Sequence, residues 1–293
     1  MKGIDISTLQ GNVDFKKVRA AGYEFAMIKA TQGRGEGAAT RLLRRFTDSK
    51  FKRNIDAAAK AGLACGVYHY MTAKNVYEAE EEAEYFCAVI APYRDCITLW
   101  AAVDVESDMY LSDVQPSALA QTVFHFLRTV ERHGHKSMLY TNPNYIKHRF
   151  PSGVFDAESI WLAHYNVAKP MAVPNTIIWQ KGTERVNGVN GVCDVNEGYF
   201  SAAIPAIFRL AALGVIGSPV YWCQHYSDVR HLDTLIIKAE KKIKDPPEAV
   251  IAFEAALGRL QAVGVVDSPE YWRGVANKVP YLPDLICKLG GAL

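Results

Sequence analysis

The segment Ile97-Thr-Leu-Trp-Ala-Ala-Val-Asp-Val-Glu106 ends an apolar run with two carboxylates at positions i and i+2. A short apolar run is typical of a strand that is buried on both faces of a parallel sheet. Alternate side chains of a strand point the same way, so Asp104 and Glu106 are expected on one face, roughly 6.5–7 Å apart. Buried ionisable groups need partners or a chemical task, and paired carboxylates are typical of glycoside hydrolysis. The alternative is a helix N-cap followed by a surface acid.

Runs that resemble strands recur along the chain and alternate with helical patterns. The expected strands are Lys2–Ser7, Phe25–Ala30, Leu63–Tyr70, Ile97–Glu106, Lys136–Thr141, Ser159–His164, Thr176–Gln180 and Val192–Val195. The expected helices are Asp14–Ala21, Asp48–Ala61, Val76–Ile90, Asp113–His133 and Asn142–Arg149. This alternation predicts βαβ units and a parallel sheet, although the last two gaps are too short for a crossover helix. The predicted fold class is α/β, an irregular eight-stranded barrel with about five helices.

Polar and aromatic residues gather where the expected strands end. In α/β barrels the active site lies at the carboxyl ends of the strands. The residues expected at this rim are Asp5, Tyr68, Tyr70, Asp104, Glu106, Tyr140, Asn142, Trp161, Tyr165, Gln180 and Asp194. Aromatic rings stack on sugar rings and carboxylates supply acid–base chemistry, so this set predicts a groove for a saccharide. The alternative for any single ring is a half-buried packing residue with a polar tip.

The composition is ordinary for a globular protein of 293 residues, with 49% hydrophobic residues and a net charge of +2. This balance gives no indication of nucleic acid or an anionic membrane as a partner, and no run reaches the ~18 apolar residues of a membrane span. The sequence indicates no metal site and no cofactor. The six cysteines form no Cys-x-x-Cys pair and are expected mainly as small core residues. A Cys87–Cys96 disulfide is the alternative.

A different pattern begins after Gly198, where strand signals end and helical signals dominate. The stretch at 208–222 recurs at 258–272 with a constant offset of 50 residues. Two copies over this length indicate an internal duplication. We therefore predict a barrel domain at 1–198 and a small all-α domain at 203–293. Its two repeats are expected at about 203–243 and 253–293.

The repeats carry matching helix signals. Gly214 and Gly264 fit the C-terminus of a helix. The other signals are Ser218-Pro219 and Ser268-Pro269 as helix starts and Asp245-Pro-Pro247 as the separator. Trp222 and Trp272 are expected in the core of the repeats, with a platform for a ligand as the alternative.

The segment 1–198 resembles glycoside hydrolase family 25, which contains muramidases of phages and bacteria. The motifs that carry the resemblance are Gly3-Ile-Asp-Ile-Ser7, Phe25–Thr31, Gly66-Val-Tyr-His-Tyr70, Val103-Asp-Val-Glu106, Tyr140-Thr-Asn142, Trp161-Leu-Ala-His-Tyr165, Ile178-Trp-Gln180 and Gly191–Asn196. The resemblance implies an eight-stranded barrel with five helices. It also implies cleavage between N-acetylmuramic acid and N-acetylglucosamine. One departure is Gly33–Arg45, longer and more basic than is usual, which either borders the groove or forms a solvated face.

The acidic quartet of the family falls on Asp5, Asp104, Glu106 and Asp194. The resemblance implies that Glu106 is the general acid, protonated near neutral pH. It implies that Asp104, expected to stay ionised, orients the 2-acetamido group of the substrate for attack on the anomeric carbon, with net retention. Asp5 and Asp194 would tune Glu106; an inverting reaction with one of them as base stays open. The expected substrate-binding residues are Tyr68, Tyr70, Tyr140, Asn142, Trp161, Tyr165 and Gln180.

The resemblance and the repeats together predict an endolysin-type muramidase that hydrolyses the β-1,4 bond of peptidoglycan. The expected partners are the glycan strand in the barrel groove and a wall ligand at the repeats; a dimer formed through the repeats is the alternative. The start of the chain resembles a first strand rather than a signal peptide, so we expect synthesis in the host cytoplasm and action on the cell wall after release. A bacterial autolysin and a non-catalytic wall-binding protein are the other candidates.

Overall fold

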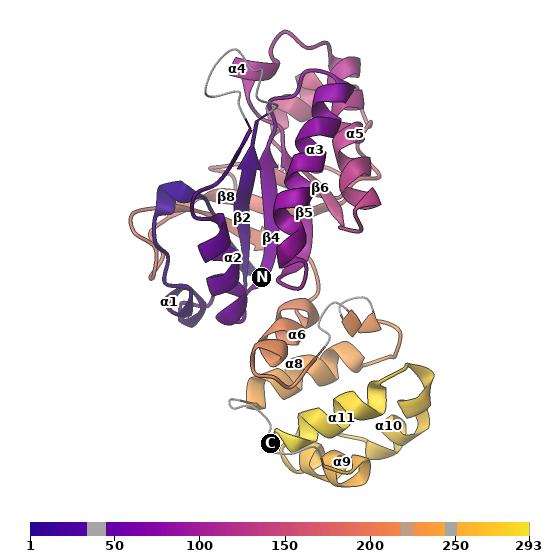
Figure 1. Cartoon of the computed structure of the whole chain (residues 1–293). Helices are drawn as coiled ribbons and strands as arrows, with labels where there is room; N and C mark the ends of the chain where they lie inside the picture. The colour runs from indigo at the N-terminus through magenta and orange to yellow at the C-terminus, as the bar shows by residue number, and fades with distance from the viewer. Residues whose placement is uncertain (34–44, 218–220, 223–224, 244–250, 293) are drawn as a thin grey trace. The chain divides into compact units, whose positions relative to one another are not determined.

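The computed structural model (Figure 1) describes residues 1–33, 45–217, 221–222, 225–243 and 251–292. Most of the basic loop at 33–45, the first Ser-Pro start and the Asp-Pro-Pro separator therefore lie outside the described residues. The chain divides into two compact units, Met1–Ala58 with Ala64–Phe200, and Ala59–Leu63 with Ser201–Leu293. Over the part of the chain that the structure describes, no helix has the length and apolar character needed to span a membrane.

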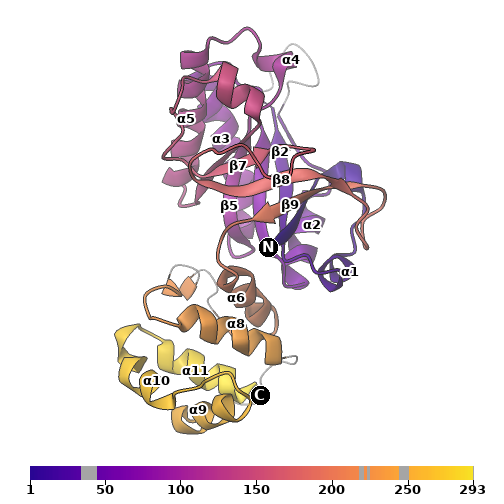
Figure 2. The same ribbon diagram turned by 180° about the vertical axis from the view of Figure 1, so that it is seen from behind.

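Eight strands of the first unit close into a barrel (Figures 1 and 2). They are β1 (Lys2–Ile6), β2 (Phe25–Gln32), β4 (Ala64–Tyr70), β5 (Ile97–Asp104), β6 (Ser137–Thr141), β7 (Ile160–Ala163), β8 (Thr176–Glu184) and β9 (Cys193–Gly198). The ring closes because β1 pairs with both β2 and β9. The short β3 (Phe46–Thr47) pairs with the end of β2. The predicted eight-stranded α/β barrel is confirmed.

The last strand of the barrel runs against the others. The barrel pairs from β1 to β8 are parallel, whereas β9 is antiparallel to both β8 and β1. The connection between β8 and β9 is too short for a crossover helix, so β9 returns beside β8 in the opposite direction. The expected parallel pairing therefore holds from β1 to β8 and not for β9, which follows one of the two gaps too short for a crossover helix. The reversal brings the start of β9 to the rim where the other strands end.

The helices of the first unit lie outside the barrel (Figure 1). They are α1 (Phe15–Ala20), α2 (Phe51–Lys60), α3 (Val76–Ile90), α4 (Asp108–Leu111) and α5 (Pro116–Arg132). The side chain of Asn75 begins α3 by accepting the backbone N–H groups of Tyr77 and Glu78. Helices α3 and α5 pack side by side. The helix predicted at 142–149 is a short π-helix, Tyr145–Arg149.

The apolar run at 97–104 is strand β5, and its Ala101, Ala102 and Val103 are fully buried. Close packing also fixes a glycine on β1, because a Cβ on Gly3 would lie 2.2 Å from the ring of Phe25. The cysteines that the structure describes are Cys65, Cys87, Cys96, Cys193 and Cys287, all with free thiols. The alternative of a Cys87–Cys96 disulfide is therefore not formed.

The second unit is helical (Figure 2). Its described helices are α6 (Ala203–Ala212), α8 (Leu232–Lys242), α9 (Phe253–Ala262), α10 (Pro269–Val275) and α11 (Leu282–Gly291). Gly214 and Gly264 follow α6 and α9 with φ of 74° and 72°, a conformation that glycine adopts without strain. Both repeats contribute to one hydrophobic core, in which Trp222 and Trp272 are each 5% exposed.

Candidate active site

A cavity of about 270 Å³ opens at the barrel rim where the parallel strands end. It brings together all the side chains predicted for the site except Asn142. Those that line it are Asp5, Tyr68, Tyr70, Asp104, Glu106, Tyr140, Trp161, Tyr165, Gln180 and Asp194. Within the described residues, no group of three or more His, Cys, Asp or Glu side chains is arranged to hold a metal ion.

Strand register sets the level of the acids. Asp104 is the last residue of β5 and is paired with Tyr70 of β4 and Tyr140 of β6. Asp5 of β1 is paired with Asp194 of β9. Because β9 is antiparallel, Asp194 comes near the start of its strand and yet reaches the same rim. Asp5 and Asp194 therefore come from opposite ends of the first unit's sequence, whereas Asp104 and Glu106 come from its middle.

Asp5 is a buried acid whose carboxylate accepts hydrogen bonds from two side-chain amides. Its Oδ2 accepts one from Gln180 Nε2 at 2.9 Å and one from Asn196 Nδ2 at 2.7 Å. Burial and then the charge of Asp194 raise the pKa of Asp5 to about 7, although the two amides act in the opposite direction. Near neutral pH a large fraction of the Asp5 carboxyl groups therefore carries a proton.

Gln180 links the acids through two tyrosines. Its Oε1 accepts hydrogen bonds from the hydroxyls of Tyr140 at 2.8 Å and Tyr165 at 2.5 Å. The Tyr140 hydroxyl also lies 3.3 Å from Glu106 Oε2, and the Tyr165 hydroxyl lies 3.2 Å from Asp194 Oδ1. The Gln180 side chain thus bonds directly to Asp5. It is linked to Glu106 through the Tyr140 hydroxyl and to Asp194 through the Tyr165 hydroxyl. The sequence indicated Gln180 only as a binding residue.

Burial raises the pKa of Glu106 and, more strongly, that of Asp104. A neighbouring acid also opposes the ionisation of each: the charge of Glu106 raises the pKa of Asp104, and that of Asp194 raises the pKa of Glu106. The expectation that Asp104 simply stays ionised is therefore not supported. Within the part of the chain that the structure describes, its buried Oδ1 has no hydrogen-bond partner. This oxygen is free to accept a hydrogen bond from a bound molecule.

Lys29 is a cavity residue that the sequence reasoning missed. It lies on β2, its Nζ donates to Gln32 Oε1 at 2.6 Å, and it stands 4.9 Å from the centre of the Tyr70 ring. Burial lowers the pKa of Lys29, while its positive charge favours the ionised form of Asp104. The available signal was a single cation within an otherwise apolar strand run, Phe25–Ala30.

The predicted groove rings differ in how far they can reach a ligand. Trp161 is 1% exposed, donates its indole N–H to Asn196 Oδ1 at 2.8 Å, and packs edge to face with Tyr140, ring centres 4.6 Å apart. These two rings therefore form the floor of the cavity. Tyr165 is 40% exposed, as suits a ring that stacks on a sugar. Leu9, which is 86% exposed, also lines the cavity and was not predicted.

Asn142 is the predicted site residue that does not line the cavity. It follows directly after β6, and its Oδ1 accepts the backbone N–H groups of Asn144 and Tyr145 at 3.0 and 3.1 Å. These bonds hold the start of the π-helix. The side chain is therefore turned toward its own backbone.

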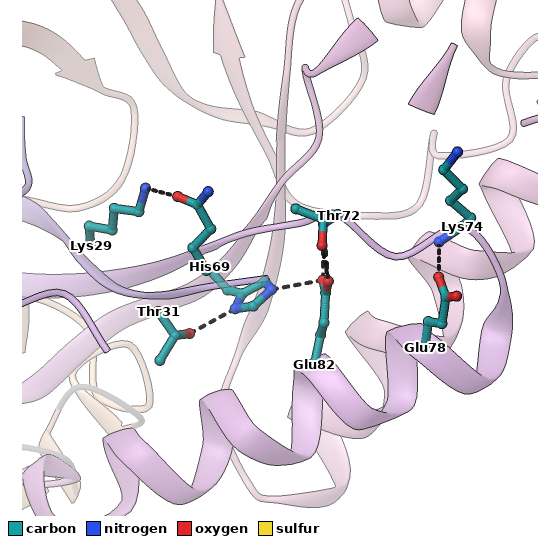
Figure 3. A network of polar contacts seen from close by, with 8 residues as sticks. Lys29, Thr31, His69, Thr72, Lys74, Glu78 and Glu82 are labelled. Atoms are coloured by element: carbon teal, nitrogen blue, oxygen red, sulfur yellow. Dashed lines mark hydrogen bonds and ion pairs between the residues drawn. The ribbon is translucent and has the colours of Figure 1, made fainter. Parts of the chain in front are cut away.

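A buried polar network lies behind the cavity wall (Figure 3). The Nε2 atom of His69 lies 2.8 Å from Glu82 Oε2, and its Nδ1 atom lies 2.7 Å from Thr31 Oγ1. The Thr72 hydroxyl donates to Glu82 Oε1 at 2.6 Å. Since side chains alternate along a strand, Tyr68 and Tyr70 face the cavity while His69 faces α3. The network thus ties the strand that carries both tyrosines to the helix outside it.

Comparisons with known proteins give consistent matches. The family model for glycosyl hydrolases family 25 matches residues 4–189. The chain is 35% identical over 199 residues to an autolytic lysozyme of Clostridium acetobutylicum, which covers 67% of this chain and 55% of that protein. It is 30% identical over 226 residues to lysozyme M1 of Streptomyces globisporus, covering 73% of this chain and 71% of that one. The chain thus spans about half the length of the clostridial relative.

Solved structures share the fold. A bacterial lysozyme from Streptomyces coelicolor superposes with a TM-score of 0.58 at 24% identity, covering 70% of this chain and 95% of that one. The CTP1L endolysin superposes with a TM-score of 0.55 at 25% identity, covering 73% of this chain and 70% of that one. The barrel architecture is therefore shared with a bacterial lysozyme and an endolysin.

Proposed function

The chain belongs to family 25 of the glycosyl hydrolases, and we propose that it is an endolysin-type muramidase. Its proposed reaction is hydrolysis of the β-1,4 bond between N-acetylmuramic acid and N-acetylglucosamine in peptidoglycan. The observation that carries the proposal is the meeting of Asp5, Asp104, Glu106 and Asp194 in one cavity with an exposed tyrosine ring. An autolysin would use the same chemistry. A non-catalytic wall-binding protein would not require four acids in one cavity.

Glu106 is proposed as the general acid. Burial raises the pKa of Glu106, so it holds a proton closer to neutral pH than a solvated glutamate does. That proton moves to the glycosidic oxygen as the bond from this oxygen to the anomeric carbon breaks. When a water later attacks the anomeric carbon, the Glu106 carboxylate takes up one of its protons.

Asp104 is proposed to orient the 2-acetamido group of the substrate. Its unpartnered Oδ1 can accept the acetamido N–H. The acetamido oxygen then bonds to the anomeric carbon as the leaving sugar departs, and water opens the resulting ring with net retention. Burial raises the pKa of Asp104 and the ammonium of Lys29 acts in the opposite direction. In either protonation state the carboxyl group keeps an oxygen that can accept the acetamido N–H.

The decisive experiment is the variant Glu106→Gln, which removes the acidic proton and preserves the size of the side chain. We expect lysis of purified cell wall to slow by a factor on the order of 10²–10⁴, with no loss of thermal stability. Mass analysis of wall digested by the unmodified protein should find new reducing ends on N-acetylmuramic acid. Near-normal lysis by Glu106→Gln, or reducing ends on N-acetylglucosamine, would overturn the assignment. The anomer first released, read by NMR, separates retention from inversion.

For the second unit we propose binding to the bacterial wall, which would hold the barrel near its substrate. Lys, Arg, Asp and Glu are nearly balanced in this unit, which favours specific contacts over attraction by bulk charge. The Glu106→Gln protein, which leaves the wall intact, should sediment with purified sacculi. A protein that stays in solution and instead doubles its mass with concentration would support self-association through the repeats.

A further inference from the structure

Two cavities lie in the second unit, and each is lined by residues of both repeats. The first, of about 290 Å³, includes Lys238 of the first repeat with Tyr271 and Trp272 of the second. The second cavity, of about 340 Å³, includes Tyr221 and Trp222 of the first repeat. We call them site A and site B. Both lie at the seam between the repeats.

The offset of 50 residues relates the lysine and the aromatic residues of one site to those of the other, with the repeats exchanged. Lys238 of site A corresponds to Lys288 of site B. In the same way Tyr271 and Trp272 of site A correspond to Tyr221 and Trp222 of site B. Helix α8 of the first copy therefore lines a cavity with the Tyr-Trp pair of the second copy, and α11 of the second copy lines one with the Tyr-Trp pair of the first. A duplication has produced two related sites that neither copy can form alone.

Reciprocal contacts across the seam fix the tyrosine rings. The Tyr271 hydroxyl donates to the backbone oxygen of Arg230 at 2.6 Å, and the Tyr221 hydroxyl donates to that of Pro280 at 2.9 Å. With their hydroxyls engaged, the rings have few alternative orientations. A ring held in this way can accept a flat ligand face with little loss of conformational entropy.

A second ring stands beside each tyrosine in a strained backbone conformation. His231 in site A and Tyr281 in site B have φ of 67° and 64°, in the left-handed region that favours glycine. Their rings contact Tyr271 and Tyr221 with centres 5.8 and 5.5 Å apart. Both copies thus keep a ring where glycine would be easier, and such strain is concentrated at functional sites.

Each site also holds one lysine beside one acid. Lys238 Nζ lies 3.0 Å from Asp267 in site A, and Lys288 Nζ lies 2.8 Å from Asp284 in site B. Both acids are more than half exposed, and exposed ion pairs of this kind stabilise a protein very little. Because little stability is lost when such a pair separates, a ligand can replace its contact. The ammonium can then bind an anion, and the carboxylate can accept hydrogen bonds from hydroxyl groups.

We propose that sites A and B each bind an acidic saccharide unit, a pyranose ring that carries a carboxylate. The fixed tyrosine ring accepts the sugar face, the lysine pairs with the sugar carboxylate, and the aspartate accepts sugar hydroxyls. This proposal names the ligand of the wall-binding role proposed above and rests on it. Each volume fits about one or two sugar units, near the lower end for ligand pockets.

The test uses the full chain and reads the sites separately through the indole N–H signals of its tryptophans by NMR. Added N-acetylmuramic acid should shift the signals of Trp272 (site A) and Trp222 (site B). N-acetylglucosamine, which lacks the carboxylate, should shift them only at concentrations about tenfold higher, as for the loss of one charge-assisted hydrogen bond. Trp161 reports any binding in the barrel cavity independently.

Because each site takes its lysine from one repeat and its tryptophan from the other, single lysine substitutions give a sharper prediction. Lys238→Met, in the first repeat, should weaken the response of Trp272 about tenfold and leave that of Trp222 unchanged. Lys288→Met should do the reverse. Lys241→Met, an exposed position on the same helix as Lys238, is the matched control and should change neither.

Several results would overturn the proposal. Equal responses of the unmodified protein to the two sugars, or an undiminished response to N-acetylmuramic acid in both lysine variants, would remove the carboxylate contact. An effect of Lys238→Met on Trp222 would refute the shared sites. Signals that move only with protein concentration, together with a doubled mass, would make the cavities a self-association surface. Failure of the muramidase assignment would be seen separately, as lysis by Glu106→Gln, because that experiment does not involve these tryptophans.

Discussion

Asp5→Asn should stabilise the fold while it impairs the site. The pKa of Asp5 is raised from 3.8 to about 7 in the folded protein, chiefly by burial. A raised folded pKa means that the folded state binds this proton more tightly than the unfolded state does. The stability that comes from this proton is therefore complete below pH 3.8 and is lost as the pH rises toward 7. Asparagine stays neutral at every pH and still offers an oxygen to Gln180 and Asn196.

The size of the effect follows from the pKa change. Each pKa unit corresponds to about 1.4 kcal/mol, so at pH 8 the variant should be more stable by about 4 kcal/mol. At pH 5 the gain should be only about 2 kcal/mol, because Asp5 of the folded protein still holds its proton there and only its ionisation in the unfolded chain lowers the stability of the unmodified protein. For a unit of this size 1 kcal/mol shifts the melting temperature by about 2–4 °C.

The measurement is thermal unfolding of both proteins at pH 5 and pH 8, beside their rates of wall lysis. Asp14→Asn is the control with the opposite sign, because hydrogen bonding from the backbone of Lys17 lowers the pKa of Asp14. Its stability should fall at neutral pH and match the unmodified protein at low pH. If Asp5→Asn raised the unfolding free energy equally at both pH values, or lowered it at pH 8, the reasoning that burial and the charge of Asp194 raise the pKa of Asp5 would be refuted.

Two further substitutions test the packing around the site. Glu82→Ala should lower the unfolding free energy by about 3–5 kcal/mol because it leaves His69 and Thr72 without their buried partner, whereas Glu82→Gln should recover much of this in the same denaturant titration. Gly3→Ala should cost about 1–3 kcal/mol, since its Cβ would meet the Phe25 ring; unchanged stability in that titration would mean that the ring moves freely.

Much of the barrel was predictable because its strands are buried on both faces. Such strands must be almost entirely apolar, so the run at 97–104 and its counterparts stand out in the sequence. The ends of strands are also visible, because polar residues there break the apolar runs. These two features placed the four acids and most binding residues at one rim. Asn142 looked equivalent by position, but its side chain caps its own backbone, a local choice that spacing does not reveal.

Chain direction and partner choice depended on the tertiary structure. The sequence indicated a strand around Asp194 but not that it runs backwards, and this reversal is what brings Asp194 beside Asp5. Neither the unpartnered oxygen of Asp104 nor the linking role of Gln180 could be read from residue type, since both depend on distances between distant segments. Lys29 was hidden for the same reason.

The family, the barrel with its acidic rim and the duplication in the last third of the chain could all be read from the amino-acid sequence alone. These features depend on residue type and on spacing along the chain, because buried strands and turns produce regular patterns of apolar and turn-forming residues in the sequence. The folded structure shows which polar side chains hydrogen-bond to one another, how the last strand closes the ring, and that each repeat completes the cavity of the other. Those outcomes depend on contacts between segments far apart in the chain, and no local pattern encodes such a distance.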